Sequence, residues 1–205
     1  MALVTKAIKG TQDLLPADSY KNRYVEQAML DIATKFGYKE IRTPVFEHTE
    51  LFERGVGDTT DIVQKEMYTF TDDGDRSLTL RPEGTAGVVR AYIEHGMHNQ
   101  AQPTKLFYIN PTFRCENTQA GRQRQFHQFG IEMLGSYSAA QDAEVISVAI
   151  TLLEEMGLDA QIQSFDVPMS NIQEAQLLVD GVSIPCKGYL CAGNGELEAP
   201  LYYLR

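Results

Sequence analysis

The sequence of 205 residues contains no tryptophan, few cysteines and no long apolar run. No stretch approaches the roughly 18 consecutive apolar residues that a membrane span requires, so we expect a soluble chain without a membrane partner. The first 16 residues lack an apolar core followed by a small-residue cleavage site, and we therefore expect no secretory signal. The three scattered cysteines, Cys115, Cys186 and Cys191, favour reduced thiols in a cytoplasm over a disulfide framework.

The composition is that of a globular protein, because 43% of the residues are hydrophobic and 22% are charged. The net charge of -10 argues against a generally basic nucleic-acid binder. The charge is uneven, however: residues 1–135 hold 16 of the 18 basic and 18 of the 28 acidic residues. A basic cleft for phosphates is therefore compatible with the sequence, because an acidic region elsewhere is screened beyond about 10 Å.

The order of apolar periods predicts the fold class. We expect helices over 20–36, 83–95 and 141–156, a strand over 38–43 that ends at Pro44, and two hairpins, 67–81 and 105–134. This order indicates an α+β fold with an antiparallel β-sheet flanked by helices. We expect one domain over residues 1–157 and an acidic tail of unknown role over 158–205.

Two of these helices have a predicted apolar face. The face of the 83–95 helix would consist of Val88, Val89, Tyr92 and Ile93. The face of the 20–36 helix is broad enough to serve an interface as well as a core; it consists of Tyr24, Val25, Ala28, Met29, Ile32, Ala33 and Phe36.

The residues best suited to chemistry lie between 78 and 132. Period-two alternation in the second long strand puts Arg122, Arg124, Phe126, Gln128, Gly130 and Glu132 on one face. The preceding strand places Asn110, Thr112, Arg114 and Glu116 on one face by the same rule. Three guanidinium groups on a sheet surface suit a polyphosphate, and an aromatic ring among them suits a base.

Simpler interpretations exist for these residues. The hairpin face is compatible with a solvated surface that carries Arg–Glu pairs. Glu83 and Thr85 begin a helix, where they would either bind a small polar ligand or simply cap the first turn. His95 and His98 lack a partner that would complete a metal site, so we predict no metal-ligating residues.

Three segments of the sequence together resemble one family. They are KGTQDLLP (9–16), LTLRPEGTAGVVRAYIEHG (78–96) and FYINPTFRCENTQAGRQRQFHQFGIEMLG (107–135). Over about residues 6–157 the chain resembles the catalytic core of histidyl-tRNA synthetases, which are class II aminoacyl-tRNA synthetases. The resemblance implies ATP-dependent activation of histidine with Mg²⁺, transfer to the acceptor end of tRNA, and a homodimer formed through the region 20–44 (motif 1).

The resemblance also implies a role for each site residue. Arg114 would be the catalytic residue, holding the ATP α-phosphate and the histidine carboxylate. ATP would further contact Glu116 at the adenine edge, Arg122 at the outer phosphates and Phe126 at the adenine face. Histidine would lie against Glu83 at its imidazole and against Thr85, Gln128 and Glu132 at its α-amino group, with Gly84 beside them. The hairpin tip would reach tRNA through Asn117, Thr118, Gln119 and Ala120.

The family pattern is incomplete in these 205 residues, because its motif 3 and its second catalytic arginine do not occur here. We therefore expect millimolar histidine binding, about -4 kcal/mol, and little adenylate formation from this chain alone. Two alternatives remain. One is a histidine-binding regulatory subunit of ATP phosphoribosyltransferase, which has the same fold; the other is a fragment that dimerises without chemistry.

Overall fold

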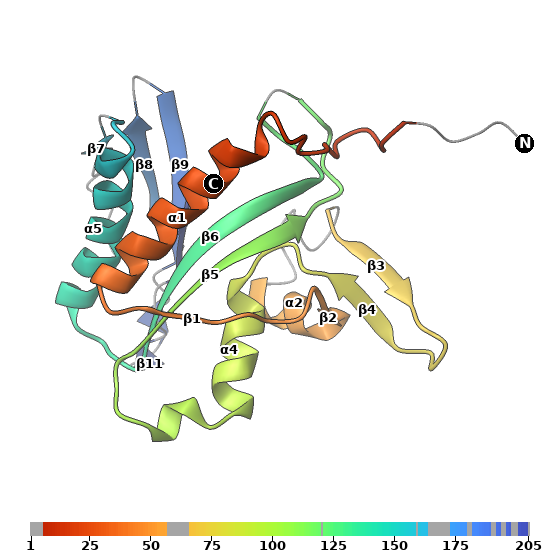
Figure 1. The fold of residues 1–205 in the computed structure, drawn as a ribbon. Helices are drawn as coiled ribbons and strands as arrows, with labels where there is room; N and C mark the ends of the chain where they lie inside the picture. The colour runs from red at the N-terminus through yellow and green to blue at the C-terminus, as the bar shows by residue number, and fades with distance from the viewer. Residues whose placement is uncertain are drawn as a thin grey trace, which may run out of the picture. The chain divides into compact units, whose positions relative to one another are not determined.

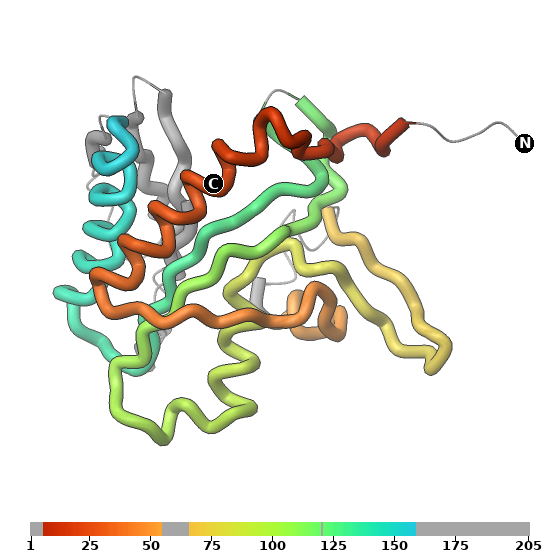
Figure 2. Tube along the Cα trace, viewed as in Figure 1, coloured from red at the N-terminus to blue at the C-terminus, as the bar shows by residue number. Residues whose placement is uncertain are grey.

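The computed structural model describes residues 6–56, 66–119 and 121–158, together with the backbone of several strands between 160 and 204 (Figure 2). Two compact units make up the chain. The first unit comprises residues 1–22, 41–96 and 108–129, and the second comprises residues 23–40, 97–107 and 130–205. None of the helices in the described parts is long and apolar enough to cross a membrane.

The first unit contains an antiparallel sheet of three short strands in the order β2-β4-β3 (Figure 1). These strands are β2 (Phe46–His48), β3 (Tyr68–Thr71) and β4 (Ser77–Leu80). Two helices accompany the sheet, α2 (Thr49–Val56) and α4 (Thr85–Glu94). Thr79 is fully buried in the central strand, where its hydroxyl lies 2.9 Å from the Thr49 and Thr69 hydroxyls.

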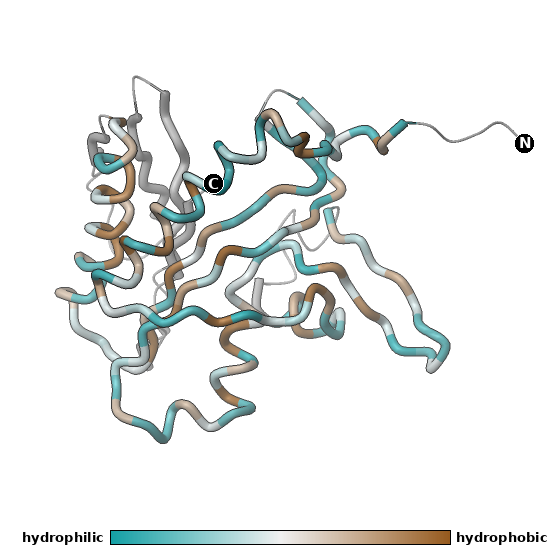
Figure 3. Tube along the Cα trace, in the orientation of Figure 1, coloured by the Kyte–Doolittle hydropathy of each residue, from teal (hydrophilic) through white to brown (hydrophobic). Residues whose placement is uncertain are grey.

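The loop between β3 and β4 is closed by Asp72. Its carboxylate accepts hydrogen bonds from the backbone N–H groups of Gly74 and Arg76, and its second oxygen lies 2.6 Å from the Arg76 guanidinium. The side-chain bond from Arg76 is the main reason that the pKa of Asp72 is lowered to about 2. The loop is hydrophilic along its length (Figure 3), so charge and hydrogen bonding rather than apolar packing stabilise the turn.

A second sheet has the strand order β1-β5-β6, and its two long strands run through both units. The long strands are β5 (Thr104–Phe113) and β6 (Gln125–Leu134), as the 105–134 hairpin predicts. The short strand β1 (Lys39–Glu40) pairs with β5 in parallel, with Lys39 opposite Leu106. The predicted strand over 38–43 is therefore mostly wrong, because pairing ends after two residues.

The second unit contains most of α1 (Ser19–Lys35) and all of α5 (Ala139–Glu155). Lys105 contacts three other residues of this unit. The Lys105 ammonium lies 2.6 Å from a Glu144 carboxylate oxygen, donates to the Phe36 carbonyl and lies over the Tyr38 ring, 5.4 Å from its centroid. Burial and the neighbouring Glu144 raise the pKa of the buried Tyr38 hydroxyl.

Beyond residue 158 the second unit continues as strands. Four of them form an antiparallel sheet in the order β12-β9-β8-β7, and β10 pairs with β11. Their bounds are β7 (Ala160–Gln163), β8 (Gln173–Val179), β9 (Val182–Tyr189), β10 (Ala192–Gly193), β11 (Glu196–Leu197) and β12 (Leu201–Leu204). The expected division of the chain into residues 1–157 and an acidic tail stays a prediction.

Sequence patterns located most helices but misjudged parts of their faces. On α4 the buried positions include Val88 and Ala91, whereas Ile93 is 60% exposed, so the predicted face is wrong at its end. On α1 the side chains of Ile32 and Ala33 are buried, but Tyr24 is 65% exposed. The apolar face of α1 is therefore only partly covered within one chain.

Candidate active site

The polar face predicted for β5 is the buried face of that strand. Asn110 is 5% exposed, Thr112 0%, and Arg114 and Glu116, just beyond the end of the strand, 3% and 9%. The side chains between them are half-buried, and Cys115 is exposed. A sheet normally buries its apolar face. The interpretation of this face as a solvated surface is therefore wrong for β5.

The same holds for the inner part of β6. Gln128 and Glu132 are buried, and Phe126 is half-buried. The backbone N–H of Arg114 donates to the Arg124 carbonyl at 2.9 Å, which sets the register where the two strands meet. In that antiparallel register Arg114 shares a face with Phe126 and Gln128, as alternation predicts. Glu132 belongs to the second unit, and its expected role stays a prediction.

Arg114 is held in place by three groups. Its Nε donates to the Pro82 carbonyl at 2.8 Å, and its Nη1 lies 3.7 Å from Glu116 Oε1. Its guanidinium lies over the Phe126 ring, 5.1 Å from the ring centroid, which is a cation–π distance. Glu116 also lies 3.5 Å from Arg122, whose side chain is 52% exposed. One buried carboxylate thus links a fixed arginine to one with access to solvent.

Arg124 is placed differently from the other two arginines. Its Nε donates to the backbone carbonyl of Glu116 at 3.3 Å, and its guanidinium hydrogen-bonds the Tyr68 hydroxyl. The pKa of the Tyr68 hydroxyl is raised, mainly by desolvation, and the neighbouring Arg124 acts to lower it. The expected row of three guanidinium groups therefore consists of a pair around Glu116 and a third that braces the backbone.

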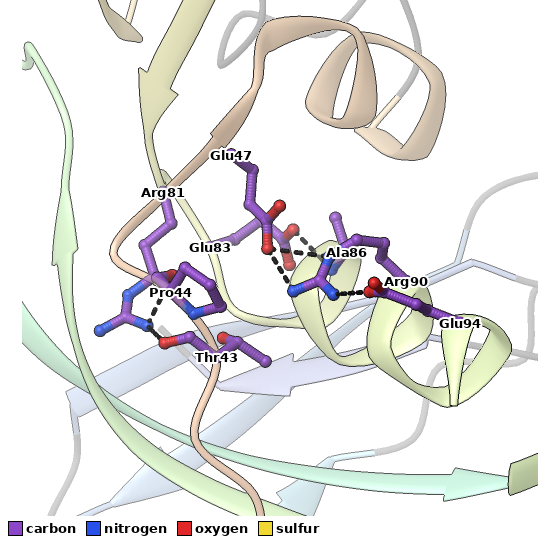
Figure 4. A network of polar contacts seen from close by, with 8 residues as sticks. All are labelled: Thr43, Pro44, Glu47, Arg81, Glu83, Ala86, Arg90 and Glu94. Carbon is purple, nitrogen blue, oxygen red and sulfur yellow. Dashed lines mark hydrogen bonds and ion pairs between the residues drawn. The ribbon is translucent and has the colours of Figure 1, made fainter. Parts of the chain in front are cut away.

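Glu83 lies where β4 passes into α4. One carboxylate oxygen accepts from the Thr85 backbone N–H at 2.6 Å. The other accepts from the Ala86 N–H at 2.8 Å, a bond that Figure 4 shows. Glu83 thus caps the helix with both oxygens, as the simpler interpretation predicts, while Gly84, the capping position, has no side chain to do so. Burial raises the pKa of the Glu83 carboxyl, against the lowering effect of these N–H groups and of Arg114.

Gly84 is required by a close approach to Tyr108. Its backbone is in the right-handed helical region, with φ -99°, so conformation alone would admit other residues. A Cβ added at Gly84 would, however, lie 2.6 Å from the Tyr108 hydroxyl oxygen and closer still to two carbons of its ring. Tyr108 is 1% exposed, so its ring has no solvent to move into.

Sequence patterns assigned no role to Arg81, which is buried in the structure at 4% exposure. Its guanidinium donates to the carbonyls of Pro111, Thr43 and Pro44 at 2.7, 3.0 and 3.2 Å; Figure 4 shows the latter two. Burial lowers the pKa of Arg81. An arginine immediately before a proline at a strand end gave only a weak signal, because its partners lie 30 or more residues away.

The tip of the long hairpin packs against the N-terminal segment. The Gly10 carbonyl accepts from the Arg124 N–H at 2.7 Å, and a Cβ at Gly10 would lie 2.5 Å from the Thr118 methyl group. Asn117 and Gln119 are exposed, and the Gln119 carbonyl accepts from the Arg122 N–H at 2.9 Å. Ala120, the last residue of the expected tRNA contact, lies outside the described residues.

Comparison with known proteins agrees with this arrangement. A family model described as histidyl-tRNA synthetase matches residues 10–184. The chain belongs to the histidyl-tRNA synthetase family. Histidine–tRNA ligase from Clostridioides difficile strain 630 is 58% identical over 164 residues, which are 80% of this chain and 39% of that protein. Its counterpart in Thermoanaerobacter sp. strain X514 is 52% identical over 192 residues, 92% of this chain and 46% of that protein.

Solved structures confirm the family's fold. Apo histidyl-tRNA synthetase from S. aureus matches with a TM-score of 0.66 and 46% identity, over 78% of this chain and 37% of that one. A structure described as an ATP phosphoribosyltransferase regulatory subunit/histidyl-tRNA synthetase from Bacillus halodurans matches with a TM-score of 0.69 and 26% identity, over 79% and 41%. The chain spans about two fifths of the length of these curated relatives.

Proposed function

We propose that this chain binds histidine and ATP and contributes to the activation of histidine and its transfer to tRNA. The observation that supports this function best is the buried polar face of β5 and β6, with Arg114 fixed on it between Pro82 and Phe126. Burying charged and polar side chains in place of apolar ones is a feature of functional sites. Membership of the family supplies the reaction class.

On the ATP side, Arg114 would hold the α-phosphate and the histidine carboxylate. One face of the Phe126 ring carries the Arg114 guanidinium, so adenine would stack on the other face. Glu116 would accept from the adenine amino group, and the exposed Arg122 would reach the outer phosphates. Mg²⁺ would arrive with the nucleotide and supply further neutralisation of its phosphates.

On the histidine side, Glu83 would accept a hydrogen bond from the imidazole, and Thr85 and Gln128 would bind the α-amino group. The two helix N–H groups that fix Glu83 leave its oxygens with lone pairs for a ligand. Gln128 Oε1 is buried and has no hydrogen-bond partner among the described residues, which suits an ammonium donor. By the family resemblance, Glu132 would also bind the α-amino group.

The proposed chemistry depends on positioning. A carboxylate oxygen of histidine would attack the α-phosphorus, forming the acyl–phosphate bond while pyrophosphate leaves. Arg114 would offset the negative charge that develops on the α-phosphate oxygens, without a reorganisation of its own because Pro82 and Phe126 already hold it. Loss of one such donor costs about 3 kcal/mol of transition-state stabilisation, a hundredfold or more in rate.

Histidine binding by the 205-residue chain is the first test. We expect millimolar affinity, about -4 kcal/mol, by calorimetry, and a loss of binding in Glu83→Gln. Glu154→Gln, which changes an exposed glutamate of α5, is the matched control and should bind as the parent chain does. Binding that survives in Glu83→Gln would remove Glu83 from the site, and no binding by a folded parent chain would overturn the proposed histidine site.

ATP binding separates the synthetase from the regulatory subunit, since a protein that only senses histidine has little use for the groups around Arg114. We expect ATP to bind and Arg114→Gln to weaken it, whereas Arg76→Gln, in the exposed β3–β4 loop, should not. Histidine binding without ATP binding would favour the regulatory alternative. Histidine-dependent pyrophosphate exchange should be slight, and rapid exchange would contradict the expectation of weak activity.

Two partners complete the proposal. The hairpin tip would meet the acceptor end of tRNA through Asn117, Thr118, Gln119 and Ala120, the first and third of which are exposed. A second copy of the chain would pack on α1, where Tyr20 and Tyr24 are more than 60% exposed. Large apolar side chains at this exposure on one helix favour an interface.

A further inference from the structure

Asn110 is a buried amide for which the site has no stated use. Its side chain is 5% exposed, and its Nδ2 donor has no hydrogen-bond partner among the described residues. Gln128, 8% exposed, has the opposite deficiency, since its Oε1 acceptor lacks a partner there. Buried polar groups in proteins are nearly always paired, and an unpaired amide that persists marks a place for a ligand or a bound water.

The neighbours of Asn110 place it beside the proposed histidine site. On the same face of β5, Tyr108 packs against Gly84, and Arg114, just past the end of the strand, donates to the Pro82 carbonyl. Asn110 lies between these two contacts on that face. The register set by the bond from Arg114 N–H to the Arg124 carbonyl, followed four residues along each strand, places Asn110 opposite Gln128.

An unpaired donor and an unpaired acceptor on opposing residues match a ligand that carries both charges of an amino acid. The α-ammonium and the α-carboxylate are attached to one carbon, whereas the imidazole is one carbon farther away. If the ammonium donates to Gln128, the nearest acceptor that histidine offers to Asn110 is therefore its carboxylate. We propose that Asn110 Nδ2–H donates to the α-carboxylate of histidine, an assignment that rests on the proposed function.

The test compares histidine with histidinol, in which a hydroxymethyl group replaces the carboxylate. Affinities are measured by NMR titration of the full chain, its Asn110→Ala and Asn110→Asp variants, and the control Asn99→Ala, which changes an exposed asparagine. Asn110→Ala should lose about tenfold or more in affinity for histidine and little for histidinol. Asn110→Asp should lose more, because it sets a carboxylate against a carboxylate.

Thermal unfolding of the ligand-free variants gives a second readout. Asn110→Ala should lower the unfolding midpoint only slightly, because the Nδ2 donor that it removes has no hydrogen-bond partner among the described residues. A large drop in the midpoint, an unchanged histidine affinity, or an equal loss for histidine and histidinol would each overturn the assignment. If the parent chain binds neither compound, the proposed function fails as well; if it binds histidine and Asn110→Ala binds equally, only this inference fails.

Discussion

Gly84→Ala tests whether the Glu83 loop is fixed by its contact with Tyr108. The backbone at Gly84, with φ -99° and ψ -26°, accepts alanine without strain, so the effect reports the contact alone. The new methyl group would sit 2.6 Å from the Tyr108 hydroxyl oxygen and closer to the ring carbons Cε2 and Cζ. Because ordinary contacts begin near 3.4 Å, the ring or the loop must move.

Overpacking of this kind in a buried site costs about 1–3 kcal/mol of unfolding free energy. We place Gly84→Ala at the upper end, about 2–3 kcal/mol, because the clash involves a ring that is 1% exposed rather than a flexible side-chain end. For a chain of this size that corresponds to a fall in melting temperature of about 5–10 °C. Histidine affinity should fall too, since Glu83 moves with the loop.

Denaturant unfolding followed by circular dichroism is the assay, with Gly74→Ala as the matched control. The nearest atom to a Cβ at Gly74 is an Asp72 oxygen at 3.4 Å, an ordinary contact, so this variant should change stability by less than about 0.5 kcal/mol. Tyr108→Leu should partly rescue Gly84→Ala, whereas Tyr108→Phe should not, because the clashing carbons remain. Equal midpoints for Gly84→Ala and Gly74→Ala would refute the reasoning.

Three further predictions concern other contacts. Arg81→Met should lower the unfolding free energy by about 3 kcal/mol, measured by urea unfolding, because it leaves buried carbonyls without donors; Arg76→Met, in the exposed loop, is the control. The pKa of the Asp72 carboxyl is lower in the folded than in the unfolded chain, so its contribution to the stability of the turn is present above about pH 4 and is lost as the pH falls to about 2. Hydrogen exchange of the Gly74 and Arg76 amides should therefore become faster over that range in the parent chain. In Asp72→Asn it should show no such rise. Sedimentation at tens of micromolar should show a homodimer that Tyr24→Glu dissociates, and a stable monomer of the parent chain would contradict the interface on α1.

Local patterns predicted the elements whose causes are local. The α1 helix follows from its apolar period, and the β3–β4 hairpin follows from its Asp72-Asp73-Gly74 turn, closed by bonds within five residues. The helix α2 and the strand β2 were missed because each is short, and strand pairing of Phe46 with Leu80 joins residues 34 positions apart. No pattern of a few residues carries that information.

Alternation along β5 and β6 identified which residues share a face but not whether that face is buried. Asn110, Gln128 and Glu116 look the same in the sequence as on a solvated hairpin, and periodicity alone favours the solvated interpretation. Arg114, on the same face, is held by the Pro82 carbonyl, which lies 32 positions away in the sequence. Burial of a polar strand face is therefore a tertiary property.

The segment 81–85 explains why the two proposed ligand contacts are coupled. Arg81 donates to backbone carbonyls of two distant segments. The Pro82 carbonyl accepts from Arg114, and Glu83 accepts from the first N–H groups of α4. The proposed phosphate-binding guanidinium and the proposed imidazole-binding carboxylate thus share one short piece of backbone. A shift of this segment would displace both groups together, so substitutions at Arg81 or Gly84 should weaken histidine and ATP binding in parallel, although neither side chain is assigned to hold ATP.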